Sequence, residues 1–298
     1  MLVALEDGTP LRGDFVLRAV QRFDLTPIPS TLEVVLRSDD TLAGRIAYGT
    51  LLLAGSSQDR YRIVKLRRAT SEWTQGRDAP AQVIEATAIL DGFAALAWPL
   101  QRAVVKESKS LGEVYRACGA AARITADIPA GRFTCLAGQF PTPGIAQLLQ
   151  EEAAAAVWSA AGALSFIRLP DLFTGLPVDR IAADTTRVVD SPFLERQEIP
   201  WALSTAPDGA AVLGNRSEAR GFVYLPRTGA RVLNNMTRCL VVRRTLVSGF
   251  AGHIRAGDGF DVAGIRHVVA TVAHSWESAV GGGSADQVTR LWLAQIQR

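Results

Sequence analysis

The pattern of hydrophobic and polar positions changes along the chain from strand-like to helix-like and back again. Over the first ninety residues, short apolar runs at 15–23, 32–37, 61–66 and 82–90 are separated by glycine, proline and aspartate turns. This part of the chain therefore predicts about five or six strands. Because the connecting segments leave no room for crossover helices, we expect the strands to be mainly antiparallel, as in a barrel or a sandwich.

The longest stretch with helical spacing lies in the middle of the chain. Thr142 is a favourable N-cap residue, and Pro143 suits the first helical position, where a missing N–H costs nothing. Apolar residues then follow at helical intervals, interrupted by Glu152: Ile145, Leu148, Leu149, Ala153, Ala156 and Val157. The alanines at 153–156 favour helix further, and 164–169 predicts a strand that packs nearby.

Shorter elements complete a middle region of mixed α and β structure. Residues 103–106 and 133–136 predict short strands. Between them, Ser110 and Glu113 have the spacing of a capping box at the start of a helix, and Gly119 is well placed to end it. The resulting order of strand, helix, strand, helix and strand predicts an α+β unit.

The strand-like pattern returns in the last third, after a proline- and glycine-rich passage that follows Asp184. Irregular passages of this kind are typical of segments that cross a surface or contact a partner. The runs that predict strands are 231–233, 238–247, 265–276 and 288–296. We expect the last two to form a hairpin through a glycine-rich loop at 281–284.

These patterns predict a mainly β protein with a small α+β insert. We expect a first antiparallel β-barrel at 1–97, a helix-containing middle region at 98–183 and a second antiparallel β-barrel at 184–298.

Composition agrees with a folded protein that is kept soluble in the cytoplasm. Of 298 residues, 48% are hydrophobic and 20% charged, and the formal net charge of +3 is too small to indicate a nucleic-acid surface by itself. No uncharged apolar run approaches the ~20 residues of a membrane span, and the first residues lack the basic region of a secretory leader. The three cysteines are widely spaced, which favours buried thiols over disulfides or a zinc site.

Residues with catalytic chemistry are few, and we assign no catalytic, cofactor-binding or metal-binding role. His267 and His274 are seven residues apart on one predicted strand, so they should point to opposite faces and not share a metal. With His253, they are interpreted as structural or solvent-facing. Glu151 and Glu152 should project about 100° apart on the helix, as part of a solvated face. Nucleophile-elbow, dinucleotide-binding and P-loop motifs are absent from the sequence.

Two pairs of arginines raise a more specific hypothesis. Arg18 and Arg22 share one face of a predicted strand, and so do Arg60 and Arg62. If these strands lined a channel, the four side chains would place positive charge along its wall. The simpler interpretation is that alternating arginines mark the solvated face of a half-buried sheet.

Local patterns now add a resemblance to a known family. The C-terminal stretches 255–269, 272–275 and 289–293 resemble the strand pair of the last barrel in phage tail baseplate hub proteins. The stretches 110–119, 144–152 and 162–166 are similar to the helix, helix and hairpin insert between the two tube-like barrels of the hub. This chain departs from the family at His267, where an aromatic residue often stands.

The resemblance implies a structural, non-enzymatic virion protein of the tail baseplate, assembled in the host cytoplasm. It implies a homotrimer in which three chains, with two tube-like barrels each, form a pseudo-sixfold ring that continues the tail tube. Such a ring would bind the central spike protein and tail tube or distal tail proteins. DNA would pass through it during genome ejection without specific binding, and no cofactor is implied.

Two alternatives remain at this point. A cell-wall-degrading enzyme of the tail tip would need a paired carboxylate or a Cys–His site, which the sequence does not reveal. A spike component of the type VI secretion system would carry a fused needle. We expect a phage or phage-like particle instead, since this chain ends at Arg298 without a glycine-rich β-helix.

Overall fold

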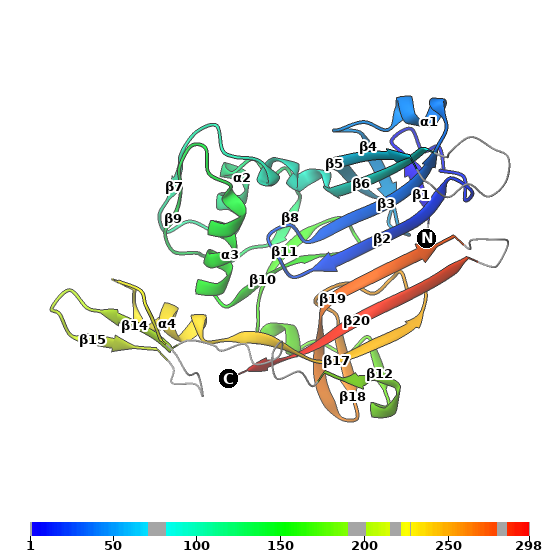
Figure 1. Cartoon of the computed structure of the whole chain (residues 1–298). Helices are drawn as coiled ribbons and strands as arrows, with labels where there is room; N and C mark the ends of the chain where they lie inside the picture. The colour runs from blue at the N-terminus through cyan, green and yellow to red at the C-terminus, as the bar shows by residue number, and fades with distance from the viewer. Residues whose placement is uncertain are drawn as a thin grey trace.

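The mainly β fold that the sequence predicts is confirmed by the structure, a computed structural model. The structure describes residues 2–70, 82–189, 201–214, 222–226, 228–278 and 285–297. Figure 1 shows strands from the two ends of the chain side by side in one broad sheet. In the part described, no helix has the length and apolar character that crossing a membrane requires.

N-terminal strands form one half of the sheet, in the order β1-β4-β5-β6-β3-β2, and all neighbours in this half are antiparallel, as predicted. The strands are β1 (Val3–Leu5), β2 (Val16–Asp24), β3 (Ser30–Ser38), β4 (Leu51–Ala54), β5 (Asp59–Thr70) and β6 (Gln82–Leu90). Helix α1 (Asp40–Arg45) connects β3 to β4, and Leu42 packs into the core beneath the strands.

C-terminal strands form the other half of the sheet. They are β17 (Cys239–Gly249), β18 (Gly259–Val262), β19 (Ile265–Glu277) and β20 (Asp286–Gln297), with β12 (Asp179–Ile181) and β13 (Arg187–Val188) at the margins. The predicted β19–β20 hairpin is confirmed, although its expected loop at 281–284 lies outside the described residues.

The two halves are joined because β2 pairs with β19, from Asp24 opposite Thr271 to Arg18 opposite Glu277. The sequence predicted two barrels but gave no sign of this pairing. It satisfies the hydrogen-bonding groups along one edge of each half, which exposed edges would leave open to association. Each half keeps its own apolar core, around Leu32 in the first and around Val272 in the second.

The middle region begins with the 3-10 helix η1 (Asp91–Ala97) and contains β7 (Val104–Lys106), which pairs with β9 (Phe133–Cys135). Helix α2 (Leu111–Ala117) has the predicted capping box: the Ser110 hydroxyl accepts a hydrogen bond from the Glu113 backbone N–H, and the Glu113 carboxylate accepts one from the Ser110 backbone N–H. Three of the residues that it buries, Leu111, Val114 and Tyr115, lie in the first core.

Helix α3 (Pro141–Glu151) differs from its prediction at both ends. Its N-cap is Phe140 rather than Thr142, so Pro141 occupies the first turn. At the other end, Ala153 has φ of 45°, a left-handed conformation that stops the helix, and the alanine run continues as strand β10 (Ala154–Trp158). Pairing with β11 (Leu164–Arg168) therefore overrides the helical preference of alanine.

A further small sheet and a helix lie next to α3. The sheet contains β14 (Trp201–Thr205), β15 (Ala211–Leu213) and β16 (Phe222–Tyr224). The strand expected at 231–233 is wrong, because these residues belong to helix α4 (Ala230–Met236). The Asn235 side chain donates a hydrogen bond to the Glu151 backbone carbonyl at 3.0 Å, which attaches α4 to the end of α3.

Division of the chain at 97/98 and 183/184 stays a prediction. The pairing of β12 with β18 shows that residues just before the second boundary bond to the C-terminal half. Between β11 and β12 the 3-10 helix η2 (Asp171–Phe173) intervenes, and η3 (Ala183–Thr185) precedes β13.

Candidate functional site

The arginines singled out in the sequence lie on the face of the sheet that points away from the cores. Along β2, Ala19 and Phe23 are buried at 1% exposure each, whereas Arg18 and Arg22, which directly precede them, are exposed. The strand period of two accounts for this alternation.

Cross-strand pairing brings Arg60 and Arg62 to the same face. Residues directly opposite each other on neighbouring strands project to the same side of a sheet. One such row crosses the sheet through Arg62, Ile89, Thr31, Arg22 and Ala273. Arg60 is two residues from Arg62 on β5 and projects to this side as well. We call this side of the sheet the polar face.

A groove of about 280 Å³ crosses the middle of the polar face, and β2, β3, β19 and β20 all contribute to its lining. The charged side chains that line it are Arg18, Arg22, Glu33, Glu277 and Arg290. Three basic groups against two acidic groups give a surface that is only slightly positive. Such a surface attracts a polyanion weakly.

Carboxylates partly neutralise all four candidate arginines. The nearest N···O distances are 3.4 Å for Arg18–Glu277, 2.8 Å for Arg22–Asp24, 3.0 Å for Arg60–Glu6 and 2.7 Å for Arg62–Asp91. The four arginine side chains are 40% to 55% exposed, so water screens these pairs and each contributes little to stability. Their main effect is on the electrostatic potential of the polar face.

Both histidines of β19 are buried, and the prediction that they point to opposite faces is wrong. A β-bulge between Val269 and Thr271 adds one residue to the strand, so Val269 and Val272 enter the same core. His267 and His274 consequently project to one side, at 1% and 0% exposure. Within the described residues, no cluster of three His, Cys, Asp or Glu side chains could hold a metal ion.

A buried ion pair connects the two halves of the sheet. Asp59, at the start of β5, lies 3.5 Å from Arg255 in the β17–β18 connection, and their side chains are 3% and 4% exposed. The Trp158 indole donates a hydrogen bond to the other Asp59 oxygen at 3.0 Å, and the Arg255 guanidinium lies 3.9 Å from the centroid of the Phe23 ring. We call these four residues the dry joint.

Burial in the dry joint lowers the pKa of Arg255, while the opposite charge of Asp59 raises it. The ion pair therefore compensates for the cost of removing the guanidinium from water. Arg255 and Asp258 belong to the stretch that carried the family resemblance, and the Asp258 carboxylate accepts a hydrogen bond from the Arg255 backbone N–H at 2.7 Å. The motif thus has a structural role in holding the two halves together.

Glu152 forms a second buried junction, which contradicts its interpretation as part of a solvated face. Its side chain is 1% exposed and accepts two hydrogen bonds from Arg231 of α4, at 2.6 and 2.9 Å. Arg168 of β11 lies 3.4 Å from one of the same two carboxylate oxygens. Hydrogen bonding to Glu152 raises the pKa of Arg231. We call these three residues the open joint, since the arginine side chains are 59% and 35% exposed.

The sequence did carry a signal for the open joint. Glu152 interrupts the apolar stripe of the expected helix, and a charged residue in a buried stripe needs a partner of opposite charge. Its partners lie 16 and 79 residues further along the chain, so no local pattern identifies them.

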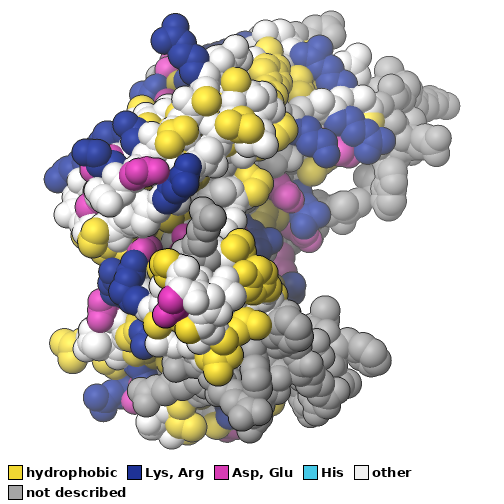
Figure 2. All heavy atoms as spheres, turned by 90° about the vertical axis from the view of Figure 1, so that its left-hand side faces the viewer, with side chains coloured by type: hydrophobic (Ala, Val, Ile, Leu, Met, Phe, Trp, Pro, Cys, Tyr) yellow, Lys and Arg dark blue, Asp and Glu magenta, His cyan; other side chains and the backbone are white. Residues whose placement is uncertain are grey.

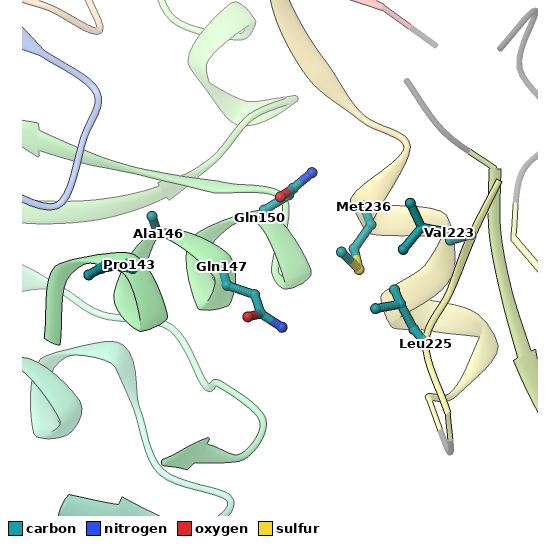
Figure 3. Close-up of a pocket in the computed structure, with 8 residues that line it drawn as sticks. Pro143, Ala146, Gln147, Gln150, Val223, Leu225 and Met236 are labelled. Atoms are coloured by element: carbon teal, nitrogen blue, oxygen red, sulfur yellow. The ribbon is translucent and has the colours of Figure 1, made fainter. Parts of the chain in front are cut away.

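Beside the open joint, a groove of about 530 Å³ separates α3 from β16 and α4. Figure 3 shows Pro143, Ala146, Gln147 and Gln150 of α3 on one side of this groove, with Val223, Leu225 and Met236 on the other. Direct packing between α3 and this part of the chain is therefore incomplete, and the charged contacts of Glu152 supplement it.

Comparison with known proteins places the fold. No family model matches the chain, and no curated protein sequence does either. Solved structures do match along nearly its whole length. A tail protein from Neisseria meningitidis MC58 has a TM-score of 0.64 at 9% identity and covers 99% of this chain and 95% of its own. The 43 kDa tail protein of prophage MuSo2 from Shewanella oneidensis has a TM-score of 0.64 at 10% identity, covering 98% and 97%.

A third similar structure is the E. coli c3393 protein, described as a component of the type VI secretion system with structural similarity to T4 bacteriophage tail proteins gp27 and gp5. Its TM-score is 0.55 at 10% identity, and the match covers 98% of this chain and 77% of that one. At these identities the likeness concerns the fold. The chain therefore has the fold of phage tail proteins, and the resemblance predicted from its motifs is confirmed at that level.

Proposed function

We propose that this protein is the baseplate hub of a phage or phage-like tail, a trimeric ring that joins the tail tube to the central spike. The observation that carries the proposal is the match to two phage tail proteins over at least 98% of this chain and at least 95% of theirs. A match of this extent includes both halves of the shared sheet and the middle region between them.

The shared sheet suits a ring. Each chain supplies two β-rich halves joined edge to edge through β2 and β19, so three chains would supply six such halves around one axis. The polar face would then form the wall of the genome-ejection channel. Its slight positive charge suits a channel that lets a polyanion pass without retaining it.

In this proposal the four arginines of the polar face, Arg18, Arg22, Arg60 and Arg62, contribute charge near the channel three times over. The hub would act as a structural virion protein of the tail baseplate, assembled in the host cytoplasm. Its partners would be two further copies of itself, the central spike protein and tail tube or distal tail proteins.

One alternative has support of its own. The E. coli type VI secretion component also matches 98% of this chain, with a lower TM-score of 0.55. A structure of a Francisella PdpA–VgrG complex matches 99% of this chain at a TM-score of 0.53, although only 52% of that longer chain is covered. A spike-like secretion component would use the same ring. A tail-tip cell-wall hydrolase has no comparable observation in its favour.

Solution mass gives the first test of the proposal. Light scattering after size exclusion should give about 96 kDa for a trimer of the 31.9 kDa chain. A monomer at micromolar concentration, both alone and mixed with a central spike protein, would contradict a hub.

Electron microscopy of the ring gives the second test and locates the polar face. A variant with Arg18→Glu and Arg22→Glu should assemble normally, because both side chains are exposed, but it should make the channel wall acidic. Particles that carry it should eject DNA at an altered rate. The matched control is Arg12→Glu, which reverses an exposed arginine that is paired with Asp14 and does not line the groove of the polar face. A ring with Arg18 and Arg22 on its outer surface would remove them from the channel.

A further inference from the structure

Two aromatic side chains lie exposed against each other at the boundary between the first half of the sheet and the middle region. Tyr48, between α1 and β4, is 55% exposed, and Trp98, directly after η1, is 45% exposed. Their rings form an edge-to-face pair with centroids 5.8 Å apart and an interplanar angle of 69°. Large aromatic side chains usually bury most of their surface, so an exposed pair marks a surface that favours a contact.

The pair borders an apolar groove of about 450 Å³, lined by Trp98, Pro99, Leu100 and Val104 and by the end of α2. Its walls are held by backbone contacts. Leu100 exchanges hydrogen bonds of 2.9 and 2.8 Å with Gln139 and Gly138. Gly119, with φ of 96°, lies so near η1 that a Cβ there would be 2.9 Å from Ala95. A groove whose walls are already fixed loses little entropy on binding.

The part of the chain that supplies most of this groove has an excess of positive charge. Residues 98–142 contain six basic and three acidic side chains, so this part alone has a formal charge of +3, equal to that of the whole chain. Two of the acids are in ion pairs, Glu113 with Lys109 and Glu107 with Arg132, both at 3.4 Å.

Four basic side chains remain without a carboxylate partner among the described residues: Arg102, Lys106, Arg116 and Arg123. Arg102 lines the groove itself, and Arg116 precedes the lining residues at the end of α2. Figure 2 shows basic side chains beside hydrophobic ones on the side of the molecule formed by α2, β7 and β9.

We propose that this groove is a docking site for a segment of a partner protein in which a bulky apolar side chain is flanked by aspartate or glutamate. The apolar side chain would enter between Trp98 and Val104, and the acidic groups would pair with Arg102 and Arg116. Unpaired arginines next to an exposed aromatic side chain are the composition that protein interfaces favour at their centre. The site does not depend on the trimer or the channel.

The ring geometry favours a protein segment over a glycan. Sugars stack on flat ring faces, whereas the edge-to-face arrangement of Tyr48 and Trp98 gives no common flat surface. A nucleic acid would be attracted by the charge, but the lining of the groove is mainly apolar and suits a side chain better than a phosphate backbone.

Binding of the full-length protein to a synthetic peptide array tests the proposal. The array should hold peptides of equal length in three classes, in which the residues flanking a tryptophan or leucine are acidic, basic or uncharged. The acidic class should bind best, and binding should weaken as salt is added. Arg102→Glu and Trp98→Ser should each weaken binding of the best peptides by about tenfold in fluorescence polarisation, and Arg102→Glu should do so with an unchanged melting temperature.

Matched controls are Arg12→Glu, an exposed arginine outside the groove, and Leu176→Ser, which removes a side chain that is 93% exposed elsewhere. Neither should change peptide binding. Equal binding of the three peptide classes, no binding of any class at millimolar concentration, or preferential binding of an oligonucleotide or a chitin oligosaccharide would each overturn the proposal. None of these outcomes bears on the hub assignment, which the solution mass tests separately.

Discussion

The dry joint and the open joint both hold a buried carboxylate next to arginine, but they differ in how far the arginines are exposed to water. Each places a carboxylate in the interior and connects parts of the chain that are far apart in sequence. In the dry joint both charged partners are buried, at 3% and 4% exposure. In the open joint Glu152 is buried at 1%, but Arg231 keeps 59% of its side chain exposed. A buried arginine cannot turn to water if its carboxylate is lost, whereas a half-exposed arginine can.

This difference indicates that the dry joint stays formed in the folded protein, whereas the open joint can open locally. The dry joint connects β5, β10 and the β17–β18 connection, so its loss would affect both halves of the sheet. The open joint attaches α4 to the end of α3, where the packing beside it is interrupted by a groove. We expect the sheet to behave as one cooperative unit and the α4 region to loosen first.

The largest effect should come from breaking the dry joint. Asp59→Ala leaves Arg255 buried with Asp258 as its remaining nearby carboxylate and removes the acceptor of the Trp158 indole, which costs about 3–5 kcal/mol of unfolding free energy. Denaturant unfolding followed by tryptophan fluorescence measures this loss. Asp14→Ala, which breaks the exposed pair with Arg12, is the control and should change stability by less than about 0.5 kcal/mol. Equal effects of the two changes would contradict the dry joint.

The second-largest loss of stability is expected from a substitution in α3, the helix that ends next to the open joint. Leu148 is 2% exposed in the core, whereas Gln150 is exposed at the neighbouring groove. Leu148→Asp buries an unpaired carboxylate at a cost of several kcal/mol, but Gln150→Asp should stay within about 0.5 kcal/mol. Thermal melts of both variants decide between them. Equal melting temperatures would show that α3 is held by Glu152 and not by its apolar side.

Acid should weaken the dry joint through His274. This ring donates from Nε2 to the Ile254 carbonyl at 3.1 Å and lies near Arg255. Burial lowers the pKa of His274 to about 4, with a smaller contribution from the charge of Arg255. The pKa of His274 is lower in the folded state than in the unfolded state. The contribution of the neutral ring to the unfolding free energy is therefore fully present above about pH 6.5, and about 3 kcal/mol is lost as the pH falls toward 4.

Unfolding free energies measured from pH 7 to pH 4 test this dependence. His274→Gln should remove most of the slope between pH 6.5 and pH 4, at the cost of some stability at pH 7. The same slope in the wild type and in this variant would exclude His274 as its source.

A smaller and more local effect should follow Glu152→Gln. The amide keeps the shape of the carboxylate but loses its charge, so we expect about 1–3 kcal/mol of destabilisation. Hydrogen exchange should increase in α4 and β14 and stay unchanged in β2 and β19. Arg231→Gln should have at least as large an effect, because the buried Glu152 carboxylate then loses the two hydrogen bonds that Arg231 donates and keeps only Arg168 at 3.4 Å. If hydrogen exchange increased equally in α4, β14, β2 and β19, the open joint would not open separately from the shared sheet.

The smallest effect belongs to the polar face. Arg18→Ala and Arg22→Ala remove exposed and screened ion pairs, so each should change the melting temperature by less than about 2 °C. Differential scanning fluorimetry measures this. A large loss of stability would show that these arginines hold the shared sheet together. Substitutions of Arg18 and Arg22 could then not test the charge of the channel separately from folding and assembly.

Much of the architecture was predictable because it depends on local alternation. Apolar residues at every second position predict strands such as β2 and β6, and the capping box of Ser110 and Glu113 predicts the start of α2, since the forces involved act within a few residues. The alternation also placed Arg18 and Arg22 on one side of their strand. These features need no knowledge of distant parts of the chain.

Tertiary structure decided the rest, because the deciding contacts join distant residues. Ala154 to Trp158 form a strand, against the local preference of alanine, because β11 offers hydrogen bonds that a helix would forgo. Glu152 is buried because Arg231 and Arg168 meet it there, and the pairing of β2 with β19 makes one sheet from two halves more than 240 residues apart. The sequence by itself determined the character of segments with a clear local pattern, such as β2 and α2, while the free energy of burying charge and completing sheet edges determined which elements meet.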